Sequence, residues 1–405
     1  MAYQHRPLRA DDLEQAWKLD QQVFNGDGRH RAHFDEASEP ERFQGVFDEH
    51  GRLVAMSRAL SLGQYFGGKR VSMGGLSSVG VAPEARGRGL GVATVRACLA
   101  DMRARHEVVS TLHPGTTGLY RKLGWELAGA YAIRHVSCAA LRNLSVPVER
   151  RIVRAEPSDR ARVRACYERV APTINGFLDR NESRWYYLEK AFDEFFIYLA
   201  LDAAGEVAGY IAYRHEAPLA GELGYTIRVH DWMAETREAL AALFWTVGSG
   251  STQAAIVAYE SSPEDPLLML VDDQVERVHY DVRVMTRMVD AAGAVAERGY
   301  ARALDVDLPL VIEECGASEQ AAMLADNAGA WRLQVAKGEG RLERTAQEAP
   351  EAPRISVAGL ASLYTGWAPT AFLERAGLLS GGSPEVREAL DAAFAGPTPW
   401  VSEEF

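Results

Sequence analysis

The sequence has few cysteines, and they are not arranged for a cross-link or a metal site. Cys98, Cys138, Cys166 and Cys315 are widely scattered, without a C-x-x-C pair or a histidine-rich cluster. We therefore predict neither a disulfide framework nor a bound metal. Cysteine usage of this kind is typical of a reducing compartment, so we expect a cytoplasmic protein.

Long hydrophobic runs are also missing. No uninterrupted apolar stretch of the chain approaches the ~18 residues that a membrane-spanning helix requires. The opening residues MAYQHRPLRADDLEQAW contain acids and lack the apolar segment of a secretory signal. The sequence thus predicts a soluble chain without a membrane span.

The chain also has fewer basic than acidic residues. The chain has 44 Lys and Arg against 56 Asp and Glu, which gives a formal net charge of -12. Such a field disfavours nucleic acid and anionic membranes as partners. It is compatible with a cationic substrate such as a polyamine, although solubility alone is the more common reason for this sign.

Length and composition indicate two or three domains. The 405 residues far exceed the ~150 of an ordinary domain, and 47% hydrophobic with 25% charged residues is normal for a globular protein. The first part predicts a strand at Leu8 to Ala10, a helix with an apolar face from Leu13 to Phe24, and an antiparallel meander that ends at Val81. A helix through Val92 to Met102 and a strand at Val108 to Leu112 follow.

An internal repeat indicates how the chain is organised. RPLRADD near the start is echoed by RRIVRAE from Arg150, and VFDEHGRLVAM from Val46 is echoed by ALDAAGEVAGY from Ala200. A strand at 224–230, a helix at 235–246 and a strand at 254–259 then repeat the first order of elements. Two collinear echoes with the same element order predict a duplication, with a first and a second copy of one fold.

The chain from Ala291 has another composition and is predicted to form a separate domain. Strands are expected at 304–312 and 330–335, and the polar segment 337–354 is expected to be a loop or hairpin edge. Helical spacing runs through Leu360, Leu363 and Tyr364, and a last helix from Pro384 to Phe394 begins after a Ser383 cap.

The segment VGVAPEARGRGLG, Val79 to Gly91, joins the meander to a helix and carries the chemistry. A helix start presents unpaired backbone N–H groups, and glycines let a diphosphate approach them. Only one such loop occurs, and its strand belongs to an antiparallel meander, which weakens a dinucleotide-binding interpretation. No G-K-[ST] follows, which excludes a nucleotide-hydrolysing P-loop. The remaining alternative is a solvated arginine-rich turn.

These residues resemble a known family. Val79-Gly80-Val81 followed by Arg86-x-x-Gly89-x-Gly91 resembles the acetyl-coenzyme A site of the GNAT acetyltransferases, and GLYRKLGW at Gly118 to Trp125 resembles their second signature. With the ending Glu404-Phe405, nearly the whole chain looks like the Eis (enhanced intracellular survival) acetyltransferases. The resemblance implies an α/β (α+β) fold with tandem GNAT folds of mixed central sheets, at 1–145 and 146–290, and a sterol-carrier-protein-like α+β domain at 291–405.

The resemblance also implies the residues of the site. The co-substrate would be acetyl-coenzyme A. The residues that would hold it are Val79, Gly80, Val81, Arg86, Gly87, Arg88, Gly89, Leu90, Gly91, Gly115 and Thr116. The acceptor pocket would include Phe24, Asp27, Ser78 and Glu404. Because Ser78 stands where some Eis enzymes have a bulky aromatic residue, the range of acceptors need not carry over.

Direct transfer of an acetyl group to an amine makes three chemical demands. A free alkylamine has a pKa of about 10, so a base is needed, and the resemblance gives that role to the C-terminal carboxylate of Phe405. A splayed strand at Val79 to Val81 would offer backbone donors to the oxyanion. Tyr120 is the candidate acid that protonates the thiolate. His113 and His135 are the conventional bases, although a loop histidine bonded to backbone is the better expectation for His113.

The predicted acceptor is a primary amine of a polycationic small molecule, aminoglycoside-like, or a lysine side chain. The resemblance suggests a homo-oligomer, a hexamer. The second copy has VHDWMAE at Val229 to Glu235 in place of the glycine loop, so we expect only one coenzyme A site per chain. An alternative from another class is a non-catalytic acyl-coenzyme A or lipid-binding sensor.

Overall fold

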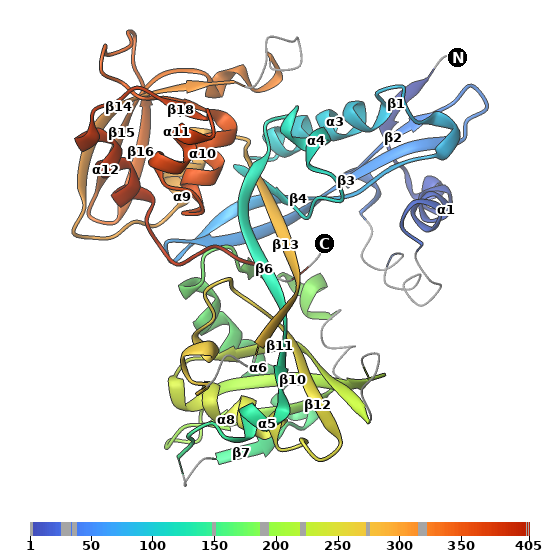
Figure 1. Cartoon of the computed structure of the whole chain (residues 1–405). Coiled ribbons are helices and arrows are strands. Elements are labelled where there is room, and N and C mark those ends of the chain that lie inside the picture. The colour runs from blue at the N-terminus through green and yellow to red at the C-terminus, as the bar shows by residue number, and fades with distance from the viewer. Residues whose placement is uncertain are drawn as a thin grey trace. The chain divides into compact units, whose positions relative to one another are not determined.

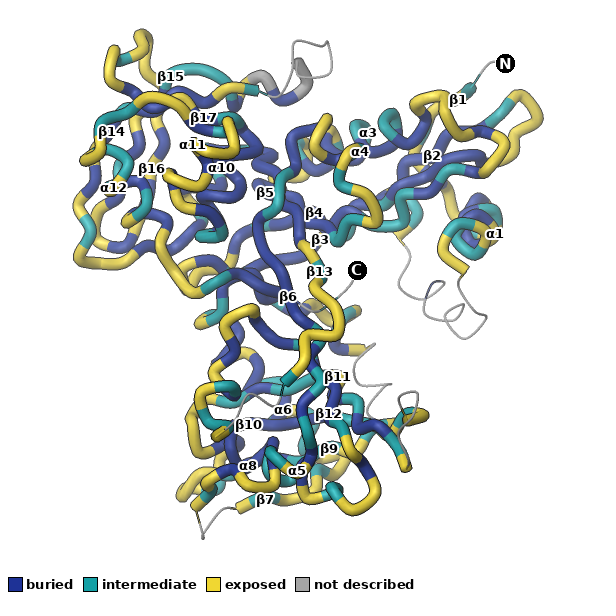
Figure 2. The backbone as a smooth tube through the Cα atoms, viewed as in Figure 1, coloured by how far each residue is buried: buried dark blue, intermediate teal, exposed yellow. Residues whose placement is uncertain are grey.

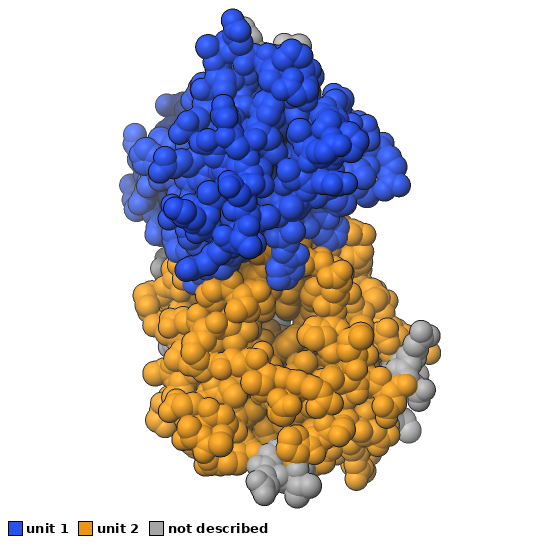
Figure 3. All heavy atoms as spheres, turned by 90° about the vertical axis from the view of Figure 1, so that its left-hand side faces the viewer, with its two compact units in different colours: residues 1–128, 284–397, 403–405 blue, residues 129–283, 398–402 orange. Residues whose placement is uncertain are grey.

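A computed structural model describes residues 3–25, 34, 39–147, 151–186, 194–218, 224–272, 276–314, 322–401, 403 and 405. It divides into two compact units (Figure 3). The first unit comprises Met1–Ala128, Val284–Pro397 and Glu403–Phe405, and the second comprises Gly129–Arg283 and Thr398–Ser402. The predictions made for Asp27, Glu404 and Cys315 lie outside the described residues.

The first unit is built on a mixed sheet of order β1-β2-β3-β4-β5-β13 (Figure 1). Its strands are β1 (Gln4–Pro7), β2 (Phe43–Phe47), β3 (Leu53–Phe66), β4 (Lys69–Val81), β5 (Val109–Leu112) and the end of β13 (Glu276–Met288). Its helices are α1 (Leu13–Phe24), α3 (Leu90–Ala104) and α4 (Thr117–Arg121). The predicted meander is confirmed, since β2, β3 and β4 pair antiparallel and β5 pairs parallel to β4.

The strand predicted at Leu8 to Ala10 is wrong. The strand is β1, which ends at Pro7, and a short 3-10 helix (Ala10–Asp12) follows. The buried carboxylate of Asp12 accepts hydrogen bonds from the Arg9 N–H at 2.7 Å and from the Arg6 guanidinium. This local bonding turns the chain into a helix start at the residues where the sequence analysis expected a strand.

The second unit repeats the pairing pattern of the first, with the order β7-β9-β10-β11-β12-β6. Its strands are β6 (Glu126–Ser137), β7 (Arg151–Arg154), β8 (Leu178–Asp179), β9 (Phe196–Leu201), β10 (Val207–Glu216), β11 (Tyr225–Ala234) and β12 (Ala254–Ser261). Its helices are α5 (Cys138–Arg142), α6 (Arg160–Val170) and α8 (Arg237–Gly248). The pair β11 and β12 is parallel and its neighbours are antiparallel, as around β4 and β5, which supports the duplication.

Each sheet takes one strand from the other half of the sequence. β6 follows the first copy in sequence but pairs with β12 of the second unit, from Ser137 with Ile256 to Ala132 with Ser261. β13 follows the second copy but pairs with β5 of the first unit, at Met285 to Met288. The two copies have therefore exchanged their last strands.

The C-terminal region, defined here as residues 291–397, belongs to the first unit and has its own sheet of order β16-β15-β14-β17-β18. Its elements are α9 (Ala291–Glu297), β14 (Asp305–Glu313), β15 (Gly329–Ala336), β16 (Glu339–Arg344), β17 (Arg354–Ser356), α10 (Val357–Tyr364), α11 (Thr370–Arg375), β18 (Leu379–Ser380) and α12 (Pro384–Phe394). The predicted Ser383 cap is confirmed, since its side chain accepts from the Val386 N–H. The predicted hairpin edge contains β16.

The C-terminal region is fixed to the first copy through the turn between β3 and β4. Phe66 is buried there and packs edge-on against Tyr364, with 5.5 Å between ring centroids. The Gly299 N–H donates to the Phe66 carbonyl at 3.1 Å. A Cβ on Gly299 would lie 2.1 Å from the carbonyl oxygen of Gly67, so the two backbones meet without room for a side chain.

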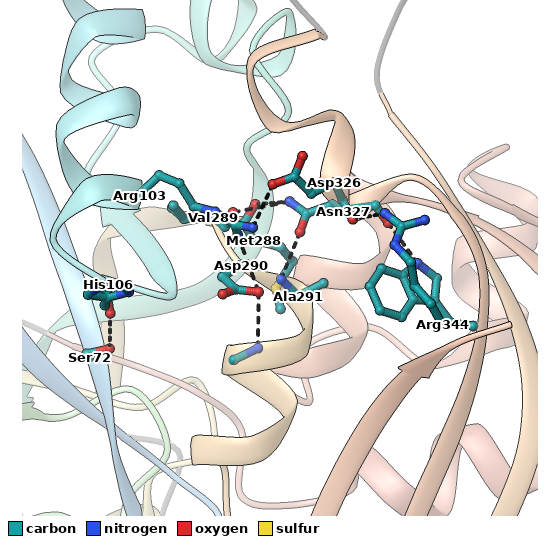
Figure 4. A network of polar contacts seen from close by, with 12 residues as sticks. Ser72, Arg103, His106, Met288, Val289, Asp290, Ala291, Asp326, Asn327 and Arg344 are labelled. Carbon is teal, nitrogen blue, oxygen red and sulfur yellow. Dashed lines mark hydrogen bonds and ion pairs between the residues drawn. The ribbon is translucent and has the colours of Figure 1, made fainter.

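Polar contacts add to this attachment at α3. Arg103 donates to Asp326 at 3.0 Å and to the Val289 carbonyl at 2.9 Å, while Asn327 accepts from the Ala291 N–H (Figure 4). Glu297 of α9 accepts from the backbone N–H of Ser72 at 2.6 Å. The strand β4 is therefore held at its start by the C-terminal region.

The described cores are apolar; β3 is buried over most of its length, and the middle of β4 is buried (Figure 2). Cys98, Cys138 and Cys166 are buried free thiols, and burial raises the pKa of Cys138 to about 11. Among the described helices, none is long and apolar enough to cross a membrane.

Candidate functional site

A bulge interrupts β4 where the sequence predicts a cofactor strand. Arg58 pairs with Ser77 and Met56 with Gly80, so Ser78 and Val79 together face the single residue Ser57. Ser78 adopts a left-handed backbone with φ of 49°. A bulge of this kind bends the strand and turns backbone groups out of the ladder. The predicted residues Val79, Gly80 and Val81 thus form the last, redirected part of β4.

The bulge lies in a part of β4 that extends beyond its parallel partner β5. β4 and β5 pair only from Met73 with Val109 to Gly75 with Thr111, whereas β4 continues to Val81. The stretch of β4 after Gly75 therefore extends beyond its pairing with β5. A strand edge of this kind offers N–H and C=O groups to an extended amide-bearing ligand.

The glycine loop lies at the N-terminus of α3, which runs for 15 residues from Leu90. Gly87 and Gly89 have φ of 76° and 75°, which glycine adopts without strain. An added Cβ at either position would meet nothing within 4 Å, so the loop faces open space. At Gly91 the Cβ would lie 3.3 Å from Val81, so this glycine lets α3 approach the end of β4. The N-terminus is therefore accessible, and its unpaired N–H groups suit an anion.

Two arginines flank this loop. The Arg86 Nε donates to the Val81 carbonyl at 3.3 Å, which ties the loop to the end of β4. The Arg88 guanidinium donates to the Tyr3 hydroxyl. Both arginines are exposed, so their charges are available beside the helix N-terminus.

Tyr120 lies on the short helix α4 and is 8% exposed. Its ring shares one hydrophobic cluster with Leu76 and Val95, against which Val79 also packs. The structure thus brings together Tyr120 and the bulged strand. Burial raises the pKa of the Tyr120 hydroxyl, and no hydrogen bond or charge among the described residues opposes that shift. The hydroxyl is accordingly a proton donor throughout the neutral range.

The turn after α4 fixes the backbone of Tyr120. The Trp125 N–H donates to the Tyr120 carbonyl at 3.1 Å and the Gly124 N–H to the Arg121 carbonyl at 3.1 Å. With Gly124 at φ of 87°, this is a Schellman motif. A Cβ on Gly124 would lie 1.7 Å from a nitrogen of Arg287, so glycine is required there. The Gly124-Trp125 pair at the end of the second sequence signature therefore forms this turn.

Phe405 lies where the pairing of β4 and β5 ends. A Cβ on Gly75 would come within 2.8 Å of its ring, and the His113 ring lies edge-on to it with 5.4 Å between centroids. Gly75 was not predicted as a site residue. The only signal for it is the pair Gly74-Gly75 within a strand, a place where glycine is otherwise unfavourable.

The other predicted residues are more dispersed. Gly115 and Thr116 lie between β5 and α4, and Thr116 is the N-cap of α4 without a side-chain cap bond. Phe24 ends α1 and is 51% exposed. His135 belongs to the second unit, where its ring stacks on that of His279.

The second copy retains the bulge but not the loop. Ala212 pairs with Asp231 and Tyr213 with Val229, which leaves His230 as the bulged residue of β11. β11 then continues to Ala234, and α8 begins at Arg237 after a Thr236 cap. The helix predicted at 235 thus starts two residues later, directly after a longer strand. The described residues contain no counterpart of the loop from Ala82 to Gly89.

In the second copy, a side chain links the two parallel strands beyond the end of their backbone pairing. β11 and β12 pair as far as Arg228 with Ala258, and beyond this point the Trp232 indole N–H donates to the Glu260 carbonyl at 2.9 Å. Asp231 is held by the buried Arg180 at 2.9 Å. In the second copy, the strand that corresponds to β4 is therefore linked to its parallel partner beyond the end of their backbone pairing.

Models of known protein families match three parts of the chain. A family model of an acetyltransferase (GNAT) domain matches residues 4–128, and a second model with the same description matches residues 176–289. A sterol carrier protein domain model matches residues 291–402. An uncharacterised N-acetyltransferase of Streptomyces coelicolor is 27% identical over 361 residues, which is 84% of this chain and 82% of that protein.

Three solved structures are similar over the whole chain. A GCN5-related N-acetyltransferase from Kribbella flavida is 30% identical with a TM-score of 0.85, covering 100% of this chain and 98% of that one. Another from Anabaena variabilis is 25% identical with a TM-score of 0.89, covering 100% of both chains. Eis1 from Mycobacterium abscessus is 27% identical with a TM-score of 0.80, covering 99% of this chain and 100% of that one.

Proposed function

The chain belongs to the GCN5-related N-acetyltransferases, and from this premise we propose that it transfers the acetyl group of acetyl-coenzyme A directly to a primary amine. It is an Eis-like enzyme with two GNAT domains and a C-terminal sterol carrier protein domain. Family membership implies an acyl-coenzyme A and an amine acceptor. We propose in addition that the transferred acyl group is acetyl, and we propose the roles of the individual residues and the class of the acceptor.

The observation that carries the proposal is the open glycine loop beside the bulged end of β4. We assign the diphosphate of the co-substrate to the N-terminus of α3, with Gly87 to Gly91, Arg86 and Arg88 around it. The end of β4, Val79 to Val81, would bind the pantetheine arm through backbone groups, and Gly115 and Thr116 would line the same side. Because a Cβ at Gly87 or Gly89 would meet nothing within 4 Å, this loop leaves room for the diphosphate.

In the proposed mechanism the chain supplies a base, an oxyanion donor and an acid. When bound, the co-substrate supplies the acetyl group as a thioester. The carboxylate of Phe405 removes a proton from the amine, and a backbone N–H at the bulge of β4 donates to the oxygen that becomes negative. Tyr120, whose pKa is raised by burial, keeps its proton until the thiolate leaves.

The acceptor in this proposal is an aminoglycoside-like polyamine or a lysine side chain. The net charge of -12 is compatible with a cationic acceptor. Phe24 and Ser78, with Asp27 and Glu404 outside the described residues, would contact it. The proposal further includes three domains at 1–145, 146–290 and 291–405, a hexamer and a cytoplasmic location, each inferred from the sequence.

A direct test measures coenzyme A release from acetyl-coenzyme A with kanamycin-type amines and with a lysine peptide. We expect turnover in the wild type and a loss of about 10²-fold or more when one glycine is added after Phe405, because the carboxylate is displaced. Unchanged turnover in the extended protein would exclude Phe405 as the base. No turnover with any amine would favour the non-catalytic acyl-coenzyme A or lipid-binding alternative.

A further inference from the structure

Gly74 and Gly75 lie in the middle of β4, and each leaves out a side chain for a different reason. Successive residues of a strand point to opposite faces of its sheet. A Cβ on Gly74 would lie 2.6 Å from the Met102 side chain of α3, so this glycine lets the helix pack on the strand. A Cβ on Gly75 would lie 2.8 Å from the Phe405 ring and 2.9 Å from Leu62. Gly75 therefore faces the terminal residue, whereas Gly74 faces α3.

Phe405 makes these contacts within the first unit. Residues 403–405 belong to that unit, together with β3, β4 and β5. The ring of His113, the residue directly after β5, lies edge-on to the Phe405 ring with 5.4 Å between centroids. Gly75 and Leu62 are buried, whereas Phe405 and His113 are partly exposed. A chain end is ordinarily poorly ordered unless something holds it, and the bare backbone at Gly75 gives the terminal ring a place on the sheet.

The acid and the terminal ring lie on opposite faces of β4. Leu76, the residue after Gly75, shares the hydrophobic cluster of Tyr120 and Val95. The Phe405 ring lies at Gly75 and thus on the other face, since β4 pairs regularly with β3 at both residues. In the proposed reaction the acid serves the leaving sulfur and the base serves the incoming nitrogen. Their separation across the strand is consistent with these two roles.

We infer that Gly75 is a positioning residue for the base, because its missing side chain gives the Phe405 ring a place on β4 and the ring in turn holds the terminal carboxylate. The inference rests on the proposed function, in which that carboxylate is the base. The ring and the carboxylate are carried by one Cα, so a displaced ring moves the carboxylate with it. A misplacement of about 1 Å can cost ~10²-fold in rate. A side chain at position 75 would therefore slow turnover without touching the glycine loop at α3.

The test compares Gly75→Ala with Gly63→Ala in the full-length protein. Both glycines lie in strands, but the atoms nearest to a Cβ on Gly63 would all belong to the exposed Arg70 guanidinium, which can move aside. We expect Gly75→Ala to lower kcat about 10- to 100-fold with acetyl-coenzyme A affinity unchanged, and Gly63→Ala to stay within about 2-fold of the wild type. Melting temperatures separate a lost position from lost folding. Wild-type kcat in Gly75→Ala would overturn the inference.

A double-mutant cycle with Phe405→Ala isolates the contact with the ring. This variant removes the ring but keeps a terminal carboxylate, and we expect it to lose about 10- to 100-fold in kcat as well. Adding Gly75→Ala to it should lower kcat by less than about 3-fold further, because no ring is left to displace. A fully additive loss would show that the added methyl acts through Leu62 or the strand, and would overturn the inference. Wild-type kcat in Phe405→Ala would do the same.

Release of the terminal residue by carboxypeptidase, followed by mass spectrometry, gives a readout that does not depend on turnover. We expect Phe405 to leave Gly75→Ala about 10-fold faster than Gly63→Ala, because the tail detaches from the sheet more often. Equal release rates would contradict the contact between Phe405 and Gly75. If the wild type acetylates no amine, the proposed function fails, whereas the release rates still decide whether Gly75 holds the chain end.

Discussion

Tyr120 combines burial with a fixed backbone, and both properties bear on proton donation. A buried phenol is harder to ionise than a phenol in water, since desolvation penalises the phenolate. Its proton is therefore retained below an ordinary pKa of about 10 and lost only as pH rises through the higher pKa of the folded protein. The Schellman turn at Gly124 holds the residue that carries this proton in one place.

We predict that Tyr120→Phe lowers kcat by about 10²- to 10⁴-fold with little change in acetyl-coenzyme A affinity. In the wild type the alkaline fall of kcat should lie above pH 10, because the protonated phenol is the active form. Steady-state rates from pH 6 to 11 check both statements. A Tyr120→Phe variant with wild-type kcat would remove Tyr120 from the mechanism, and an alkaline fall well below pH 10 would contradict the burial argument.

For single residues, the sequence indicates a special backbone conformation where an unusual residue type stands at a fixed spacing. The glycines of the loop and the Gly124-Trp125 turn belong to this group, since their conformations leave a local trace. The left-handed Ser78 and the space that Gly75 leaves for Phe405 do not, because both depend on contacts with distant residues. A histidine such as His135 cannot be assigned to a unit from sequence at all.

Among the elements, the turn between β3 and β4 makes a contact whose energy can be measured. It presents Gly67 to Gly299 of the C-terminal region at a distance that excludes a Cβ. We predict that Gly299→Ala destabilises the protein by about 1–3 kcal/mol, because the backbones must separate. Denaturant unfolding checks this value.

Gly118→Ala on α4 is the matched control for that measurement. An added Cβ there meets nothing within 4 Å, and alanine is the better helix former. Its stability should be unchanged or slightly higher. Equal stability of Gly299→Ala and the wild type would show that the two backbones can move apart at no cost.

Most helices and strands were predictable, and the exceptions share a cause. The meander, α3, α12 and the strands of the second copy follow local periodicity and caps. β6 and β13 were not predicted, although each exceeds ten residues, because their partners lie far away in the sequence. The end of β11 was misplaced for a related reason, since Trp232 is extended by its contact with β12.

For the whole molecule, the unequal copies determine the number of co-substrates bound. The first copy has an accessible glycine loop at Gly87 and Gly89, whereas in the second copy β11 ends at Ala234, only two residues before α8, and the Trp232 indole is bonded to Glu260. We predict one acetyl-coenzyme A per chain by titration calorimetry. Two equivalent sites would refute the difference between the copies.

The exchanged strands also impose an order on protein synthesis. β5 ends at Leu112, but its partner β13 is complete only at Met288. At ~5–20 residues per second, the ribosome needs about 10–35 s to make the intervening chain. During that time the nascent first copy carries an unpaired sheet edge, which is a site for aggregation or for a chaperone. Neither copy can complete its native sheet as a separately expressed half, and a gene divided between them would have to restore both strands.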